Sequence, residues 1–370
     1  MPAGYTMISI GFPLIYRQEA GLLDRIGPLV APFGKRPYVV ADAFVRETYG
    51  ARLEAALAAS GLKAACDPFE GECSPRAIDL AAARLRDGGF DCVIGMGGGK
   101  AIDAAKAVRI ETGVPVIVLP TIASNDSPTS RLAITYEDDG TFIGPRFMAT
   151  NPEAVLVDSE IIVRAPLRFF CAGIADAFVT MFEAEQVVAS GNPNFFGTQP
   201  TEAALCLARH CHAVIREHGA AAVRDVAAQR LSPAVDKVIE ANILLSGLGF
   251  EGCGVAGAHA IGMALSVLPG AKGILHGEEV AIGLLAQLHL EGRDPAFLDE
   301  VLNFYGEIRL PRSLAEVGLS GTSDEDRARV AAFAARPGSR IHNMTRSVTP
   351  ADVETALAWV ASLDTDYPEP

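Results

Sequence analysis

Hydrophobic residues before position 162 occur in short apolar runs, and patterns typical of helices separate these runs. The predicted strands are residues 38–41, 91–96, 114–119, 132–136 and 154–157, with helices at about 44–60 and 100–112. Gly61 and Gly113 follow these helices, in the position where glycine commonly ends a helix. Strands that are apolar throughout and alternate with helices indicate a parallel sheet covered on both faces.

Beyond position 162 the strand pattern disappears and long helical patterns replace it. The predicted helices are residues 169–190, 201–218, 221–231, 232–268 and 278–291. We therefore predict an α/β domain with a parallel, Rossmann-like sheet at residues 1–162 and an all-α domain at residues 163–370. Ligands of open parallel sheets bind at the carboxyl ends of the strands, so we expect the active site between that edge and the helical domain.

Composition narrows the class of partner. The net charge of −14 disfavours nucleic acid, since such surfaces need a basic stripe. We expect no membrane partner, because the most apolar region, residues 241–271, carries Asn242, Glu251 and His259, and no basic leader precedes the first apolar residues. The seven cysteines are scattered and never in C-x-x-C spacing, which is typical of reduced thiols in a cytoplasmic protein.

The stretch GMGGGKAIDAAKAV, residues 95–108, places three consecutive glycines between a predicted strand and a predicted helix. It departs from the nucleoside-triphosphate loop, because Ile94 stands where that motif begins with glycine and Ala101 has no hydroxyl for magnesium. It also departs from the common dinucleotide fingerprint, because Lys100 stands where the third glycine belongs.

An anion site explains this loop better than a simple turn does. Three glycines in a row cost conformational entropy that a turn does not require. Lys100 lies in the first helical turn, where a cation opposes the helix dipole unless an anion is near. We predict that the loop binds a dinucleotide pyrophosphate and that Asp42, at a strand end, accepts the ribose hydroxyls, which favours NAD over NADP. The alternative is a strand-to-helix turn with no ligand.

Three residues form a candidate metal site. His259 lies in the small-residue run GVAGAHAIGMA, His276 in GILHGEEV, and Asp176 in the apolar stretch CAGIADAFVTMFEAE. A buried carboxylate is costly unless it is paired or binds a metal. One carboxylate with two histidines leaves a coordination position for substrate, which is typical of a catalytic site. The alternatives are hydrogen-bonded core histidines and a helix N-cap role for Asp176.

Several long stretches resemble one known family. They are PFEGECS (68–74), GGGKAIDAAKAV (97–108), PTIASNDSPTSRLAITY (120–136), NPEAVLVD (151–158), AGIADAFVTMFEAE (172–185), SGLGFEGCGVAGAHAI (246–261), LHGEEVAIG (275–283) and IHNM (341–344). They are similar, in the same order, to the glycerol dehydrogenases of the metal-dependent (iron-containing) alcohol dehydrogenase family, which are related in fold to dehydroquinate synthase. The resemblance covers nearly the whole chain and implies a dehydroquinate-synthase-like fold.

The resemblance implies metal-assisted oxidation of glycerol, or a similar vicinal diol, to dihydroxyacetone with hydride transfer to NAD. The implied catalytic residues are Asp126, Asp176, His259 and His276, of which the last three bind zinc, with iron as the alternative. The expected cofactor-binding residues are Asp42, Gly97, Gly98, Gly99, Lys100, Ala101, Ile102, Asp103, Thr121, Ile122, Ala123, Ser124, Ser130, Leu132 and Tyr136. Asp126, Phe250 and Arg131 are the substrate candidates, and the family suggests a homo-oligomer, often an octamer.

Three positions depart from the family pattern. Gly262 stands where a second histidine is usual, Met263 where a small polar residue is common, and Arg131 where a small residue is usual. If Arg131 faces the substrate it favours an anionic compound, as in a glycerol 1-phosphate or hydroxycarboxylate dehydrogenase; otherwise it points to solvent. A dehydroquinate-synthase-like lyase is a more distant alternative, which the chain's few lysines disfavour. The complete metal set disfavours a non-enzymatic nucleotide-binding protein.

Overall fold

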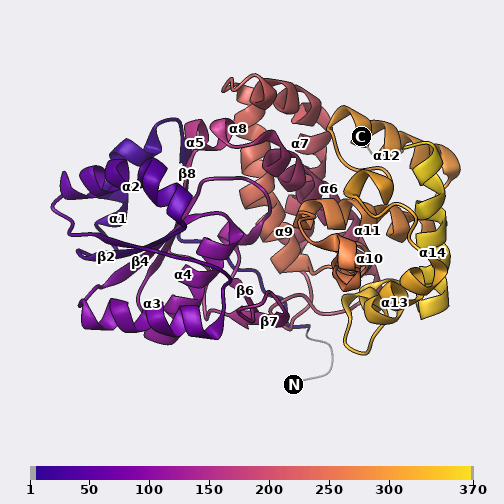
Figure 1. Ribbon diagram of the computed structural model, residues 1–370, viewed down its shortest axis with the longest axis horizontal. Coiled ribbons are helices and arrows are strands. Elements are labelled where there is room, and N and C mark those ends of the chain that lie inside the picture. Colours follow the sequence, from indigo (N-terminus) through magenta and orange to yellow (C-terminus); the bar gives the residue numbers. More distant parts are fainter. Residues whose placement is uncertain (1–5, 368–370) are drawn as a thin grey trace. The chain divides into compact units, whose positions relative to one another are not determined.

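The computed structural model describes residues 6–367, which divide into two compact units (Figure 1). The sheet unit comprises Gly11–Pro166 and Ala228–Gly247. The helical unit comprises the residues up to Ile10, Leu167–Ala227 and the residues from Leu248 onward. Each unit is therefore assembled from segments that are far apart in the sequence.

A six-stranded sheet forms the centre of the sheet unit, and all its strand pairs are parallel. Its strands, in spatial order, are β1 (Ile15–Glu19), β8 (Ala154–Asp158), β5 (Val116–Pro120), β4 (Cys92–Gly97), β2 (Pro37–Ala41) and β3 (Ala65–Pro68). The helices of this unit are α1 (Gly27–Val30), α2 (Ala43–Ala58), α3 (Pro75–Asp87), α4 (Gly99–Thr112), α5 (Ser159–Arg164) and α8 (Pro233–Glu240). Figure 1 shows α1 and α2 on one face of the sheet and α3 and α4 on the other, as the apolar strands predicted.

The strand order reverses direction at β2 and β4. From β2 the chain moves outward to β3, then returns to β4 and continues through β5 to the other side of the sheet. In open parallel sheets the carboxyl ends of two such strands border the ligand-binding crevice. Asp42 directly follows β2, and the glycine run ends β4, so both lie at this switch point.

Two further strands form a separate antiparallel hairpin. They are β6 (Leu132–Tyr136) and β7 (Phe142–Phe147). The side chains of Phe142, Ile143 and Phe147 on β7 are exposed. The predicted strand at residues 132–136 is thus present but lies outside the parallel sheet.

The helical unit contains helices and short helical turns around a core of its own. Its α-helices are α6 (Leu167–Ser190), α7 (Glu202–Ala227), α9 (Ser246–Cys253), α10 (Gly257–Ala264), α11 (His276–Leu290), α12 (Pro295–Glu307), α13 (Asp324–Ala334) and α14 (Pro350–Ser362). The parallel sheet in one unit and the helices in the other confirm the predicted fold class. Within residues 6–367 no single helix has the length and hydropathy of a membrane span, although the bent pair Pro233–Cys253 and Gly257–Val267 meets both criteria together.

The long helix predicted at residues 232–268 is broken in two places. A π-helical turn, Ala241–Leu245, separates α8 from α9, and a non-helical turn separates α9 from α10. Gly254 in the second turn has φ of 104°, a conformation that side chains strongly disfavour. Conversely, the predicted helices at 201–218 and 221–231 form one helix, α7, because Gly219 is tolerated inside a helix.

The two units are not separated by one boundary near residue 162, where the sequence analysis placed it. Residues 228–247 return to the sheet unit after α6 and α7. The reason is visible in three hydrogen bonds to the loop after β5, from Asn242 Nδ2 to Ala123 O, from Thr129 Oγ1 to Ile243 O, and from Ser246 Oγ to an Asp126 carboxylate oxygen. A hydropathy pattern reports helices but not the unit against which each one packs.

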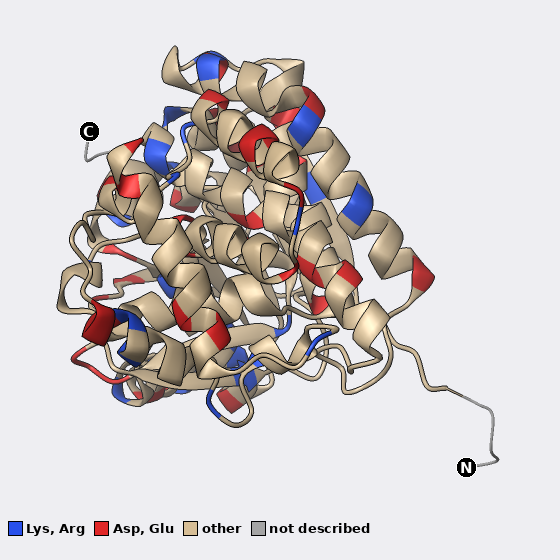
Figure 2. Cartoon of the chain, turned by 90° about the vertical axis from the view of Figure 1, so that its right-hand side faces the viewer, with Lys and Arg blue, Asp and Glu red and all other residues tan. Residues whose placement is uncertain are grey.

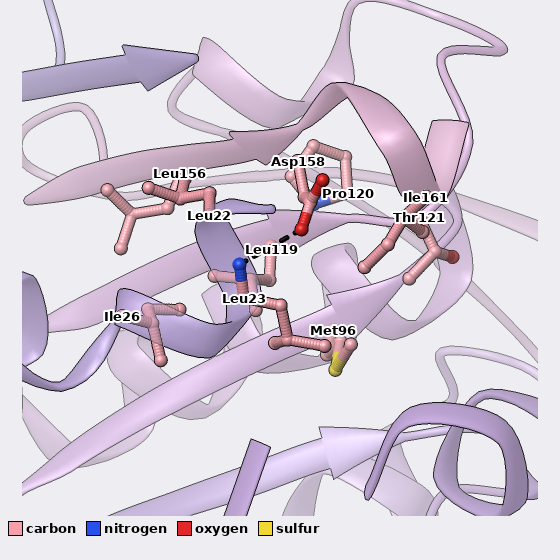
Figure 3. A pocket seen from close by; sticks show the side chains of 10 residues that line it. All are labelled: Leu22, Leu23, Ile26, Met96, Leu119, Pro120, Thr121, Leu156, Asp158 and Ile161. Carbon is pink, nitrogen blue, oxygen red and sulfur yellow. Dashed lines mark hydrogen bonds between the residues drawn. The ribbon is translucent and has the colours of Figure 1, made fainter. Parts of the chain in front are cut away.

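Asp158, at the end of β8, joins three segments of the sheet unit. Its carboxylate accepts hydrogen bonds from the backbone N–H groups of Gly21, Leu23 and Glu160, each at 3.0 Å. Figure 3 shows the bond to Leu23 beside a void of about 10 Å³ lined largely by apolar side chains. A void of this size suits at most one water, so it is a packing feature and not a substrate site.

Most charged residues lie on the surface, where Lys and Arg are interspersed with Asp and Glu in the view of Figure 2. The buried charged residues among those described are Asp103, Lys106, Asp126, Asp158, Asp176, Glu183, Asp225 and Glu251. Lys106 on α4 is completely buried, and its ammonium donates to the carbonyls of Ser127 and Leu132. Asp103, one turn earlier, lies 4.0 Å from it. Lys106 therefore fastens the loop after β5 to the helix that follows the glycine run.

We predict that Lys106→Met lowers the free energy of unfolding by about 3 kcal/mol, because it leaves the Asp103 carboxylate and two carbonyls without their cation. Urea denaturation followed by circular dichroism measures this change. The double variant Asp103→Asn, Lys106→Met serves as the control and should recover part of the loss, since it also removes the buried negative charge. Equal stability of Lys106→Met and wild type would contradict the anchoring role.

Candidate active site

The glycine run adopts a backbone that side chains would disrupt. Gly97 has φ of 149°, and a Cβ on it would lie 3.0 Å from the Cβ of Ala101. A Cβ on Gly98 would lie 2.9 Å from Ile122 Cδ1. Helix α4 begins directly afterwards at Gly99, and Gly98 contributes no side-chain cap to its N-terminus. The first-turn N–H groups of α4 are therefore suited to an anion at the switch point of the sheet.

Asp42 is held beside this loop. One carboxylate oxygen accepts the N–H of Val45 at 2.9 Å, which caps the N-terminus of α2. The other oxygen faces the glycine run, 3.5 Å from the position that a Cβ on Gly97 would occupy. A carboxylate fixed in this way is suited to accept the hydroxyl hydrogens of a ribose whose pyrophosphate lies on the loop.

The two charged residues of α4 in the predicted cofactor set have partners within the protein. Lys100 Nζ donates to Glu72 Oε1 at 2.5 Å on the surface. The buried carboxylate of Asp103 accepts the backbone N–H of Ile134, and burial raises its pKa to about 6. Asp103 thus joins α4 to β6. The helix-dipole argument for an anion beside Lys100 weakens, because Glu72 already balances that charge.

The loop after β5 carries most of the remaining predicted cofactor residues. Thr121 N donates to Gly97 O at 3.0 Å, so this loop starts beside the glycine run. Asn242 Nδ2 donates to Ala123 O at 3.1 Å, which fixes its middle. Ser246 Oγ lies 3.2 Å from Asp126 Oδ2 and orients the side chain of Asp126, the candidate substrate-binding residue. A Cβ on Gly247 would lie 1.9 Å from Thr129 Oγ1, so this contact requires glycine.

The other predicted residues of this region occupy three environments. Ala101 and Ile102 are buried in the first turns of α4, and Ile122 and Ser124 lie in the loop after β5. Ser130 and Leu132 contact the ammonium of Lys106, through a hydroxyl at 3.4 Å and a carbonyl at 2.8 Å. The ring of Tyr136 packs edge-on against Phe142 in the hairpin.

Arg131 also packs on the hairpin. Its guanidinium lies over the ring of Phe147, 5.8 Å from the centroid, and donates to the carbonyl of Met148. Phe250, the third substrate candidate, is buried in the helical unit, where it meets the ring of Phe195 edge-on at 5.4 Å. These contacts give both side chains packing roles within their own units.

The three predicted metal ligands come together in the helical unit. Asp176 Oδ1 lies 3.4 Å from His259 Nε2 and 3.7 Å from His276 Nε2. The three residues come from α6, α10 and α11, which pack against one another (Figure 1). Their ligand atoms all lie within 4.8 Å of one another, and no other group of three His, Cys or acidic side chains in residues 6–367 does so. A carboxylate oxygen and two imidazole nitrogens facing one point suit a zinc or iron ion.

Asp176 lies in the interior of α6, which excludes the N-cap alternative for this residue. Its side chain is completely buried. His276 is the first residue of α11, so the preceding turn and the helix together fix its direction. The structure therefore supports the ligand interpretation over the alternatives left open by the pattern.

Glu183 is a buried residue of this cluster that the sequence reasoning did not identify. It lies two helical turns after Asp176 on the same face of α6, a spacing that could have revealed it. Its Oε2 lies 2.5 Å from His259 Nδ1. Its Oε1 accepts the backbone N–H groups of Ala256 at 2.8 Å and of His259 at 2.9 Å. One carboxylate thus contacts both the ring and the backbone of a predicted ligand.

Two other buried polar side chains fix the start of α10. Gln287 Oε1 accepts the N–H of Ala258 at 2.7 Å, and Asn343 Nδ2 donates to the carbonyl of Val255 at 2.7 Å. Asn343 belongs to the IHNM stretch, for which the sequence alone offered no role. Together with Glu183, these side chains satisfy backbone groups in the turn that leads to His259.

The two histidines have different electrostatic surroundings. Burial lowers the pKa of His276, which favours the neutral imidazole that binds metals. Burial acts in the same direction on His259, but the carboxylates of Glu183 and Asp176 outweigh it and raise the pKa of that residue well above its usual range. Burial also raises the pKa of Glu279 to about 8, and its Oε2 lies 4.0 Å from His276 Nδ1. The carboxylates of Asp176 and Glu183 thus favour positive charge at His259.

Gly262 has a packing explanation. A Cβ on this residue would lie 2.4 Å from the carbonyl oxygen of Glu279, and a Cβ on Gly283 would lie 2.0 Å from that of Ala258. The two glycines therefore let α10 and α11 approach backbone to backbone. A side chain at position 262 would meet α11, so the close packing of these two helices requires glycine there.

Comparison with known proteins identifies the family of the chain. The pattern of the iron-containing alcohol dehydrogenases matches residues 13–159. The chain is 42% identical to a glycerol dehydrogenase of Thermotoga maritima over 94% of both chains. It is 41% identical to a glycolaldehyde reductase of Halobacterium salinarum over 93% of this chain and 94% of the relative. The structure of glycerol dehydrogenase from Schizosaccharomyces pombe is similar with a TM-score of 0.93 and 32% identity, covering 98% of this chain and 92% of that one.

The chain belongs to the iron-containing alcohol dehydrogenase family. Within that family it is similar along nearly its whole length to the glycerol dehydrogenases, as the sequence motifs predicted.

We predict that Gly262→His, which introduces the histidine usual in the family, lowers the free energy of unfolding by about 2 kcal/mol or more through overpacking against α11. Thermal unfolding measures the effect, and Met263→His at the adjacent, partly exposed position is the control. A Gly262→His variant as stable as the control would show that α10 and α11 do not need this close contact.

Proposed function

We propose that the protein is an NAD-dependent and metal-dependent dehydrogenase that oxidises glycerol, or a similar vicinal diol, to the corresponding hydroxyketone. The observation that carries the proposal is the convergence of Asp176 Oδ1 with the Nε2 atoms of His259 and His276 at 3.4 and 3.7 Å. Asp42 after β2 and the glycine run at the end of β4 support the choice of NAD. The similarity to glycerol dehydrogenases over nearly the full length supports the choice of substrate.

In this mechanism the chain positions two groups that it does not itself contain. Asp176, His259 and His276 would hold a divalent cation, which would supply a Lewis acid for a substrate hydroxyl, and the glycine run would hold NAD, which would supply the hydride acceptor. The first-turn amides of α4 would hold the pyrophosphate, and Asp42 would hold the ribose. Asp126, oriented by Ser246, would accept a hydrogen bond from a substrate hydroxyl. The reaction needs no side-chain nucleophile.

A neutral polyol suits the proposed site better than a phosphorylated or carboxylated compound. Asp126 is a buried carboxylate, which attracts hydroxyl groups and repels anions. Arg131, the residue that would favour an anionic substrate, has its guanidinium on Phe147. The glycolaldehyde reductase among the relatives makes small hydroxyaldehydes the second candidate class, handled in the reductive direction.

Metal identity, location and assembly complete the proposal. Zinc suits a site with two imidazoles and one carboxylate, with iron as the alternative. All seven cysteines are free thiols, which supports a reducing, cytoplasmic environment. The exposed apolar side chains of β7 support association of several copies of the chain.

We predict that the purified protein reduces NAD in the presence of glycerol and loses more than about 90% of this activity on chelation, because removing the cation restores the ordinary pKa of the hydroxyl. Absorbance of NADH measures the rate, and added zinc or iron should restore it. A panel of glycerol, 1,2-propanediol, glycolaldehyde with NADH, glycerol 1-phosphate and 2-hydroxy acids defines the substrate class. Turnover of the phosphorylated or acidic compounds alone would contradict the polyol proposal.

We also predict that Asp176→Asn weakens metal binding by at least about 100-fold while NAD still binds, because a neutral amide replaces the one anionic ligand. Metal content after dialysis and NADH fluorescence titration measure the two effects separately. Glu185→Gln, an exposed carboxylate on the same helix, is the control and should retain metal. Full metal retention and activity in Asp176→Asn would exclude the proposed site.

A further inference from the structure

We propose that Glu183 is a positioning residue that holds His259 in the one tautomer able to bind the metal. This inference rests on the proposed metal site and assigns a role to a residue outside the ligand set. The carboxylate contacts Nδ1 of His259, whereas Nε2 of the same ring faces Asp176 and the proposed ion. The two nitrogens of His259 are therefore engaged on opposite sides.

The hydrogen-bond partners of Glu183 determine where the ring proton lies. An ionised carboxylate only accepts hydrogen bonds, so the short contact of 2.5 Å requires a proton on Nδ1. A neutral imidazole with its proton on Nδ1 carries its lone pair on Nε2, the atom that faces the cluster. Metal-bound histidines commonly donate their second N–H to a carboxylate in this way.

The carboxylate itself cannot rotate freely. Its second oxygen accepts the N–H groups of Ala256 and His259 at 2.8 and 2.9 Å, so both oxygens have fixed partners. The side chain of Glu183 is buried, with 1% of its surface exposed, which shields both oxygens from bulk solvent. Glu183 therefore couples the ring of His259 to the backbone that carries it.

The second histidine lacks an equally close orienting group. Oε2 of Glu279 lies 4.0 Å from His276 Nδ1, which is beyond hydrogen-bond distance. Its ring is 35% exposed, against 11% for His259. We infer that His259 is the pre-oriented ligand of the pair and that Glu183 accounts for much of the metal affinity.

Glu183→Gln tests this role because glutamine has nearly the same shape as glutamate. It replaces one carboxylate oxygen, which accepts hydrogen bonds, with an NH₂ group, which donates them. The amide oxygen of glutamine can still accept the N–H groups of Ala256 and His259. Its NH₂ group must then face Nδ1 of His259, which has to act as acceptor and moves the ring proton to Nε2. The lone pair that would bind the ion is lost although no ligand has been removed.

We expect Glu183→Gln to weaken zinc binding by about 10- to 100-fold in the absence of NAD and substrate, measured by competition with a chromophoric chelator. The zinc-loaded wild type should also show a downfield imidazole N–H proton resonance from the bond to Glu183, which the variant lacks. Gln287→Met is the matched control, since it removes a backbone hydrogen bond at the start of α10 without touching either ring. It should change zinc affinity less than about threefold.

Three outcomes would count against the proposal, and they are distinguishable. Zinc affinity of Glu183→Gln within threefold of wild type overturns it. Equal weakening in Glu183→Gln and Gln287→Met overturns it too, because Glu183 would then only support the backbone. If the wild-type protein binds no zinc or iron at all, the proposed metal site itself is wrong. If Asp176→Asn abolishes metal binding and Glu183→Gln does not weaken it, the metal site stands and only the role of Glu183 is wrong.

Discussion

The arrangement of the helical unit depends on how it compensates the energetic cost of burying two carboxylates on one helix. Asp176 and Glu183 are both buried on α6, in a stretch that is otherwise apolar except for Thr180. Each buried charge must be compensated by hydrogen bonds or an opposite charge. The compensation comes from α10 and its N-cap residue Ala256, which offer two backbone N–H groups and an imidazole, and from α11, which offers a second imidazole. The close glycine contact between α10 and α11 keeps both imidazoles within reach.

A comparable constraint operates in the sheet unit, where the loop after β5 has only one short 3-10 turn, Ser127–Thr129, to satisfy its backbone. Lys106 holds it from the side of α4, and Asn242 holds it from the π-helical turn. The polar groups of these two residues replace the ladder of a strand. A loop held at both sides can present Asp126 in one orientation, which a mobile loop could not do.

The sequence predicted the central strands because β2, β4, β5 and β8 are buried on both faces and therefore apolar throughout. It missed both edge strands, β1 and β3, since residues such as Arg17 and Asp67 interrupt their hydrophobic pattern at the exposed edge. It also merged α8, α9 and α10 into one helix. Breaks of this kind depend on contacts with other segments, which periodicity does not report.

The residues of the candidate site also fall into those that the sequence could predict and those that depend on contacts. Asp42, Asp176 and the two histidines were predictable, because each stands out chemically from its neighbours. Glu183 could have been predicted by the same argument, because it is another acidic residue in the largely apolar sequence of α6. Ser246, Asn242 and Asn343 were not, because a neutral polar residue in a helix or loop has many ordinary roles and only its contacts reveal this one.

The π-helical turn Ala241–Leu245 has a geometric consequence for everything after it. Such a turn accommodates one residue more than an α-helical turn, so the helix beyond it is rotated by about 100° relative to an uninterrupted helix. Without the extra residue, Ser246 and Gly247 would point to a different side of the helix and could not meet the loop that carries Asp126. A single inserted residue is therefore enough to convert a plain packing helix into one that contacts the loop carrying Asp126.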